Sequence, residues 1–126
     1  MTGKARILYI EDNFDNMTLV KRVLQIEGYD VIEAETGNEG VAKAVDELPD
    51  IIITDINLPD IDGYEVTNRL KSDERTTEIP VIAMTANVMK KDRKNVFDAG
   101  CDGFIAKPID IDELPGQIEK FLKGDF

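Results

Sequence analysis

Histidine is absent from the 126 residues, and cysteine occurs only once, as Cys101. Because histidine and cysteine are the usual zinc ligands, their scarcity argues against a zinc site. A single cysteine cannot form an internal disulfide, the usual covalent support of small secreted domains. We expect Cys101 to be a reduced core residue without a reactive role, and this use of cysteine favours the cytoplasm.

Long apolar runs are also missing: none approaches the length that crosses a bilayer, and residues 1–6 lack the features of a signal peptide. Basic residues are scarce, with 15 Lys and Arg against 26 Asp and Glu and a net charge of -11. The one basic cluster, within residues 90–94, is interrupted and predicts a solvated helix face. Such a charge repels nucleic-acid phosphates and anionic lipid. We expect a cytoplasmic protein that binds neither nucleic acid nor membrane.

Short β-branched runs alternate with longer amphipathic stretches along the chain. The runs lie near Gly, Pro or Asp, as buried strands commonly do, and span residues 7–10, 31–32, 51–53, 81–84 and 104–106. Apolar residues at helical spacing separate or follow them, at Leu19, Val20, Val23 and Leu24; Val41, Ala42, Val45 and Leu48; Val66 and Leu70; and Leu114, Ile118, Phe121 and Leu122. The weakest helical pattern is residues 88–99, which depends on Val88, Met89, Val96 and Phe97.

Strict alternation of strand and helix implies a parallel sheet covered by helices on both faces, an α/β architecture. Candidate helix caps are Asn13 or Asp15, then Asp62, then Asp110 or Asp112, with Gly28 ending the first helix. The polar residues 72–78 predict a surface loop, while Met17, Met84 and Met89 are expected to pack in the core. The length suits one domain, residues 1–126 with a core of about 6–121, and no output domain is expected. In sheets of this kind, functional residues gather at the carboxyl ends of the strands.

Polar residues follow four of the predicted strands, at the point where each strand ends. They are Glu11 and Asp12 after the first, Asp55 after the third, Thr85 after the fourth, and Lys107 and Pro108 after the fifth. Three convergent carboxylates repel one another and are typical of a divalent-cation site, and oxygen ligands favour Mg2+. Beside that ion, Asp55 would act as a nucleophile that forms an acyl phosphate, while Lys107 and Thr85 hold phosphoryl oxygens.

These residues, in this order and spacing, resemble the receiver domain of two-component signalling, and the resemblance runs from about residue 6 to 121. It implies a flavodoxin-like (βα)5 three-layer sandwich whose five-stranded parallel sheet has the order 2-1-3-4-5. It also implies Mg2+ ligands at Asp12, Asp55 and the backbone carbonyl of Asn57, with Glu11 acting through water. Glu11 occupies a position at which members of this family carry either Asp or Glu.

The resemblance further implies that Thr85 and Phe104 form a conformational switch and that the bond before Pro108 is cis. Short segments, including residues 84–87 and 107–110, look like those of stand-alone DivK-like regulators and of hybrid-kinase receivers. By this resemblance the chain is a single-domain response regulator, and not an enzyme beyond the phosphorylation and dephosphorylation of its own Asp55. Output would be a phosphorylation-dependent protein interaction.

The expected partners follow from the same resemblance. Because the chain has no histidine, the phosphohistidine donor must be another protein, either a histidine kinase or a histidine phosphotransfer protein. The downstream target would bind the face formed by the fourth helix, fifth strand and fifth helix. We expect a monomer, or a dimer once phosphorylated.

Three alternatives remain open at this point. One is a pseudo-receiver that binds partners without phosphorylation. A second is a haloacid-dehalogenase-like phosphohydrolase, although that class carries a second Asp where Asn57 stands here. A third is a flavin carrier on the same scaffold, but no phosphate loop rich in Ser, Thr and Gly follows the first strand, and Glu11 and Asp12 would repel a flavin phosphate.

Overall fold

A computed structural model describes residues 5–86 and 90–126, and in these residues five strands alternate with five helices. The strands are β1 (Arg6–Ile10), β2 (Asp30–Ala34), β3 (Ile51–Asp55), β4 (Val81–Thr85) and β5 (Gly103–Ala106). The helices are α1 (Phe14–Ile26), α2 (Gly37–Glu47), α3 (Gly63–Lys71), α4 (Lys90–Asp98) and α5 (Leu114–Leu122). Every predicted strand is present, each slightly longer than its apolar run.

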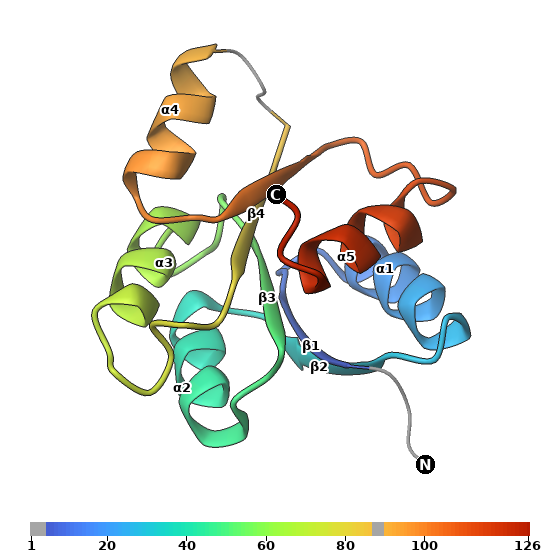
Figure 1. The fold of residues 1–126 in the computed structure, drawn as a ribbon, viewed down its shortest axis with the longest axis horizontal. Coiled ribbons are helices and arrows are strands. Elements are labelled where there is room, and N and C mark those ends of the chain that lie inside the picture. The colour runs from blue at the N-terminus through green and yellow to red at the C-terminus, as the bar shows by residue number, and fades with distance from the viewer. Residues whose placement is uncertain (1–4, 87–89) are drawn as a thin grey trace.

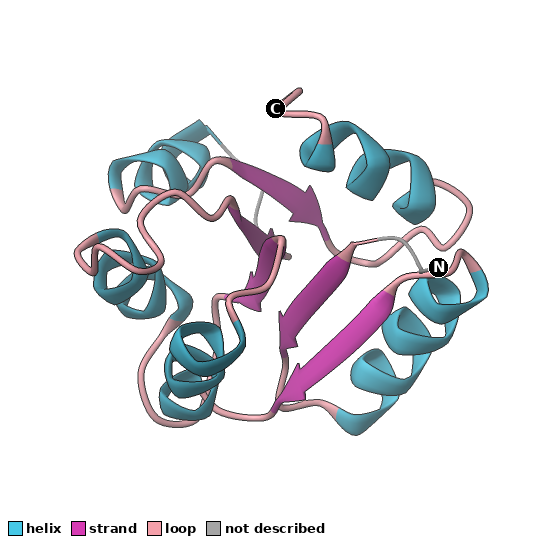
Figure 2. Cartoon of the chain, turned by 60° about the horizontal axis from the view of Figure 1, so that its bottom comes forward, coloured by secondary structure: helices cyan, strands magenta, loops and turns pink. Residues whose placement is uncertain are grey.

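The strands form one parallel sheet of order β2-β1-β3-β4-β5, which confirms the predicted α/β fold. Helices α1 and α5 cover one face, and α2, α3 and α4 cover the other (Figure 1). Figure 2 shows the strands as arrows with the helices around them, and every pair of neighbouring strands is parallel. The carboxyl ends of β1, β3, β4 and β5 therefore lie along one edge of the sheet, and the polar residues that follow these strands meet there.

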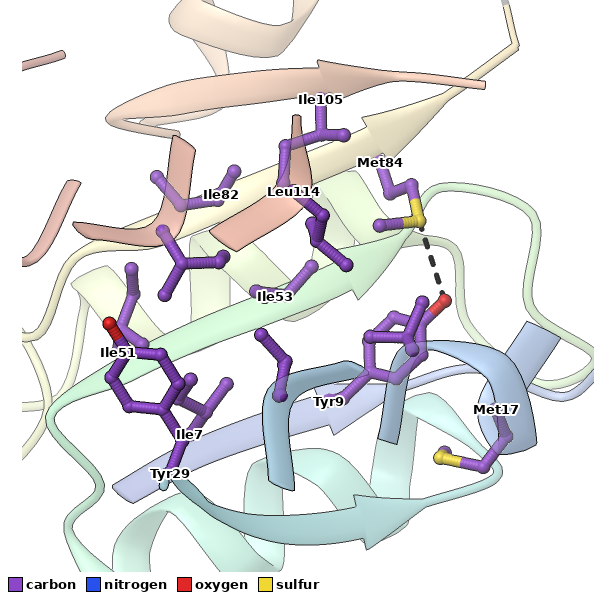
Figure 3. Close-up of a cluster of buried hydrophobic side chains, with 13 residues drawn as sticks. Ile7, Tyr9, Met17, Tyr29, Ile51, Ile53, Ile82, Met84, Ile105 and Leu114 are labelled. Carbon is purple, nitrogen blue, oxygen red and sulfur yellow. Dashed lines mark hydrogen bonds between the residues drawn. The ribbon is translucent and has the colours of Figure 1, made fainter. Parts of the chain in front are cut away.

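Two apolar clusters, one on each face, hold the helices to the sheet. Alternate strand residues such as Ile7, Ile53 and Ile82 pack under α1 and α5 (Figure 3), while their neighbours such as Leu8 and Ile52 pack under α2, α3 and α4. Side chains alternate between the two faces of a strand, so a strand buried on both faces must be apolar throughout. Burying each of these side chains contributes about 1.5–3 kcal/mol.

Two predicted caps are present at helix starts. Asn13 accepts a hydrogen bond from the backbone N–H of Asn16 at 2.9 Å, and Asp62 accepts one from Glu65 at 2.9 Å. Such caps contribute about 1 kcal/mol each. The prediction for the fifth helix was wrong, because α5 begins at Leu114. Asp110 instead accepts backbone hydrogen bonds within the preceding turn, from residues 112 and 113.

The predicted buried face of α2 was also partly wrong. Ala42 and Leu48 are exposed, and the fully buried positions are Gly37, Gly40 and Ala44. Small residues let this helix approach the sheet closely, and an apolar-periodicity rule overlooks them because glycine scores as neutral. Helix α2 is followed by Leu48, whose backbone is in the left-handed conformation with φ of 47°.

The remaining sequence predictions have mixed outcomes. Residues 72–78 form turns, as expected, but Thr76 is fully buried and donates a hydrogen bond to the carbonyl of Leu70 at 2.6 Å. Cys101 is buried and free, as expected of a core residue. Val88 and Met89 lie outside the described residues. In the part of the chain that the structure describes, no helix has both the length and the apolar character needed to span a membrane.

Candidate functional site

Three carboxylates meet where β1 and β3 end. Glu11 and Asp12 follow β1 and Asp55 ends β3, and one carboxylate oxygen from each lies within 4.8 Å of the others. Glu11 is 1% exposed and Asp55 is 5% exposed, whereas Asp12 is open to solvent. Because β1 and β3 are adjacent, their ends bring the acids together although 43 or more positions separate them in sequence. Like charges this close repel one another, and a nearby cation reduces that repulsion.

Lys107 supplies one such cation. Its Nζ lies 3.1 Å from Asp55 Oδ2 and 3.3 Å from Glu11 Oε1. Burial alone would lower the pKa of Lys107, but the hydrogen bond and charge of Asp55, followed by those of Glu11, raise it above its ordinary value. The ammonium group therefore stays charged. One ammonium cannot neutralise three carboxylates, so the cluster retains a preference for a further cation.

Glu11 is the most completely enclosed member of the cluster. Its Oε1 accepts a hydrogen bond from the hydroxyl of Tyr9 at 2.9 Å and one from Asn16 Nδ2 at 3.5 Å, and its Oε2 accepts one from the backbone N–H of Asn13 at 3.3 Å. Burial, together with the charge and hydrogen bond of Glu11, raises the pKa of Tyr9 far above its ordinary value. Tyr9 therefore remains protonated and acts as a donor.

The loop after Asp55 is fastened to two neighbouring helices. Asp60 accepts hydrogen bonds at 2.8 Å from the backbone N–H groups of Gly37 and Asn38, at the start of α2. The bond from Asn38, aided by that from Gly37 and opposed by partial desolvation, lowers the pKa of Asp60 to about 2. Gly63 donates from its backbone N–H to the carbonyl of Ile56 at 2.8 Å. A Cβ atom at Gly63 would lie 2.5 Å from the carbonyl oxygen of Asp55, so only glycine permits this contact.

Within this loop, the backbone N–H of Asn57 donates to Asp55 Oδ1 at 3.3 Å. The loop thereby holds the Asp55 side chain from one side while Lys107 holds it from the other. Oxygen atoms from carboxylates and backbone are the ligands that Mg2+ prefers, and the described cluster offers no nitrogen or sulfur ligand. The donor set fits Mg2+.

The other residues singled out in the sequence lie on β4 and β5. Thr85 ends β4, is nearly buried, and accepts a hydrogen bond at its carbonyl from the backbone N–H of Lys107 at 2.8 Å. The peptide bond between Lys107 and Pro108 is cis. Phe104 is half-buried on β5 and packs edge to face against Phe97 of α4, with ring centroids 6.3 Å apart.

Comparison with known proteins agrees with this arrangement. Residues 7–119 match the model of the response regulator receiver domain. The polar-differentiation response regulator DivK of Brucella ovis is 40% identical over 119 residues, which cover 94% of this chain and 96% of DivK. The chain belongs to the response regulator receiver family. This membership sets aside the phosphohydrolase and flavin-carrier alternatives.

Solved receiver structures have the same fold. The chemotaxis response regulator CheY4 of Vibrio cholerae has a TM-score of 0.88 at 26% identity, and the match covers 92% of this chain and 97% of CheY4. The receiver domain of the sensor histidine kinase PA1611 from Pseudomonas aeruginosa has a TM-score of 0.87 at 34% identity, covering 94% and 98% of the two chains. That structure contains a magnesium ion in its active-site cleft.

Sequence reasoning anticipated which residues of this receiver would meet, but it missed the groups that support them. Tyr9 was taken only as part of an apolar strand, and Asn16 and Asp60 were not considered as partners of the site. A signal for Tyr9 was available, because residues two apart on a strand share a face and Glu11 stands two positions later. No comparable local signal connects Asp60 with α2, because that contact joins residues 22 and 23 positions apart.

Proposed function

We propose that this receiver accepts a phosphoryl group on Asp55 from a phosphohistidine of a histidine kinase or histidine phosphotransfer protein, in a reaction that requires Mg2+. The single observation that carries the proposal is the position of the Asp55 carboxylate. The Asp55 side chain is nearly buried, contacts Lys107 at 3.1 Å, and lies among the other two carboxylates of the cluster. An aspartate that served only as a turn residue would need neither the half-buried ammonium of Lys107 nor the neighbouring acids.

The same residues provide a metal site. Asp12 and Asp55 would bind Mg2+ through their carboxylates and Asn57 through its backbone carbonyl, while Glu11 would act through a water molecule. When bound, the ion neutralises charge on the carboxylates and on the incoming phosphoryl group. Asp12 is the exposed ligand, so the ion can enter from solvent beside it.

The transfer follows from the arrangement of the protein groups. A carboxylate oxygen of Asp55 attacks the phosphorus atom, a new P–O bond forms, and the P–N bond to the donor imidazole breaks. The imidazole nitrogen keeps the electron pair of that bond and takes up a proton. The Lys107 ammonium and the Thr85 hydroxyl then hold oxygens of the phosphoryl group. The product is an acyl phosphate on Asp55.

The donor has to approach over the residues that surround the acidic cluster. Phe14 is 77% exposed at the start of α1. A hollow of about 550 Å3 beside the site is lined by Asn16, Leu19, Ala86, Lys107, Pro108 and Ile109. Apolar side chains next to a charged centre suit a partner that inserts its histidine while covering the surroundings.

Residues 1–126 would then act as one receiver domain, with output through binding to another protein. We assign that output to the face formed by α4, β5 and α5, where Phe97 of α4 is 49% exposed beside Phe104. The protein would be a monomer before phosphorylation. An acidic net charge of -11 suits a protein target over nucleic acid.

The test is intact-protein mass after incubation with acetyl phosphate, with and without Mg2+. We expect one added phosphoryl group on the parent only when Mg2+ is present, and none on Asp55→Asn. Asp46→Asn, which changes an exposed aspartate of α2, is the matched control and should be labelled like the parent. No adduct on the parent, under conditions that label another receiver, would overturn the proposal and favour a pseudo-receiver.

A further inference from the structure

A buried tyrosine hydroxyl lies directly beneath the acidic cluster. Tyr9 is fully buried, and its ring belongs to the apolar cluster under α1 and α5 (Figure 3). Its hydroxyl lies 2.9 Å from Glu11 Oε1 and 3.4 Å from the sulfur of Met84. The hydroxyl has one proton, and the charged carboxylate is both the closer and the stronger acceptor. The proton therefore belongs to the bond with Glu11.

This bond is the shortest that the side chain of Glu11 makes among the described residues. The side chain of Glu11 has no exposed surface, and its contacts with Lys107, Asn13 and Asn16 are all 3.3 Å or longer. A buried carboxylate needs such donors, because burial without them is costly. Tyr9 comes from the rigid core, whereas Lys107 must also serve Asp55.

We infer that Tyr9 is a positioning residue. By binding Oε1, it orients the Glu11 carboxylate so that Oε2 can accept a hydrogen bond from a water molecule bound to Mg2+. The inference rests on the proposed function, because it concerns the same metal site. Glutamate is one carbon longer than aspartate and has one more rotatable bond, so its carboxylate needs an added constraint to hold one direction. By holding Oε1, Tyr9 leaves Oε2 with the single described donor at Asn13.

Groups behind the ligands of a metal site commonly change metal affinity by about 10-fold or more when they are removed. Tyr9→Phe deletes only the hydroxyl and keeps the ring that fills the core. We expect this variant to bind Mg2+ about 10-fold more weakly than the parent in calorimetric titration. Tyr29→Phe is the matched control, because Tyr29 is buried in the same apolar cluster but precedes β2, at the opposite end of the sheet. It should bind like the parent.

A double-mutant cycle separates positioning from a general effect on the fold. The carboxylate of Glu11→Asp is too short to reach Tyr9, so adding Tyr9→Phe to that variant should cause no further loss of Mg2+ affinity. Equal affinity of Tyr9→Phe and the parent would overturn the inference. The inference would also be overturned if Tyr9→Phe lowered Mg2+ affinity as much in the Glu11→Asp variant as it does in the parent. Thermal unfolding of each variant checks that the titrated protein is folded.

A second measurement needs no substitution. The parent protein is labelled with 13C in its tyrosine rings and titrated with Mg2+. The NMR resonance of Tyr9 should shift, and the Kd fitted to that shift should equal the Kd from calorimetry. The resonance of Tyr29 should not change. An unshifted Tyr9 resonance, in a parent that does bind Mg2+, would overturn the inference and leave the proposed function standing. A parent that binds no Mg2+ would overturn both.

Discussion

At the scale of single residues, the site concentrates more negative than positive charge. Three carboxylates lie within 4.8 Å of one another, and the ammonium of Lys107 contacts only Glu11 and Asp55 among them. Asp12 is therefore the acid that no described cation contacts, and it faces solvent. Its repulsion from the buried acids disfavours the folded state, and a bound divalent cation would convert the same charge into an attraction.

Replacing Asp12 by Asn should separate these two effects. Without metal, we expect the free energy of unfolding to rise by about 1 kcal/mol, because one repelling charge is removed in a solvated setting. Mg2+ at 100 times its Kd should stabilise the parent by about 2.7 kcal/mol and the variant by much less. Urea unfolding with and without Mg2+ measures both, with Asp46→Asn as control. Equal stabilisation of Asp12→Asn and the parent by Mg2+ would contradict a ligand role.

At the scale of helices and strands, small residues determine how closely the helices approach the site. Gly63 begins α3 directly against the end of β3, where a Cβ would lie 2.5 Å from the Asp55 carbonyl oxygen and 2.8 Å from the Cα of Ile56. Gly37 begins α2, where a Cβ would lie 2.5 Å from the side-chain Cγ1 of Ile61. These two helix starts, together with Asp60, hold the loop that follows Asp55.

Gly63→Ala and Gly116→Ala form an informative pair, because both glycines lie in helices but only the first is crowded. Backbone atoms cannot move aside as a flexible side chain can, so we expect Gly63→Ala to lower the unfolding free energy by about 1–3 kcal/mol. Nothing lies within 4 Å of a Cβ at Gly116. Alanine there should stabilise by about 0.5–1 kcal/mol through helix propensity. Urea unfolding measures both, and a neutral Gly63→Ala would disprove the close contact.

At the scale of the whole molecule, the fold connects the site to a distant surface through β4 and β5. The carbonyl of Thr85 accepts a hydrogen bond from the backbone N–H of Lys107. Two residues before Thr85 on β4, Ala83 pairs with Phe104 of β5. Phe104 in turn packs against Phe97 of α4. Under the proposed function, a shift of Thr85 toward a phosphoryl group would reach the α4, β5 and α5 face through this strand pairing and ring contact.

Thr85→Ala should interrupt this route while leaving the acidic cluster in place. We expect the variant to be phosphorylated to a similar extent by acetyl phosphate and Mg2+, because Asp55 and Lys107 are unchanged. The phosphorylation-dependent shifts of backbone amides in β5 and α5, measured by NMR, should be reduced severalfold. Thr18→Ala, on α1, is the control. Shifts in Thr85→Ala equal to those of the parent would show that the hydroxyl does not couple the two regions.

Much of this receiver could be predicted from short stretches of sequence, because strand and helix periodicity and capping act between near neighbours. The runs at residues 7–10 and 51–53 marked two buried strands, and Asp62 marked a helix start. The alternation of the elements implied a parallel sheet, and that topology requires Glu11, Asp55 and Lys107 to meet at one edge. The sequence alone therefore determined the fold class and the members of the acidic site.

Only the tertiary structure decided how those members are held. The bond from Tyr9 to Glu11, the contact of Asp60 with the start of α2, and the glycine face of α2 depend on distances across the packed interior. Glycine carries no apolar signal, and a tyrosine in a strand looks like any other core residue. Local patterns specify which face a side chain occupies, but its partners are set by the packing of segments distant in sequence.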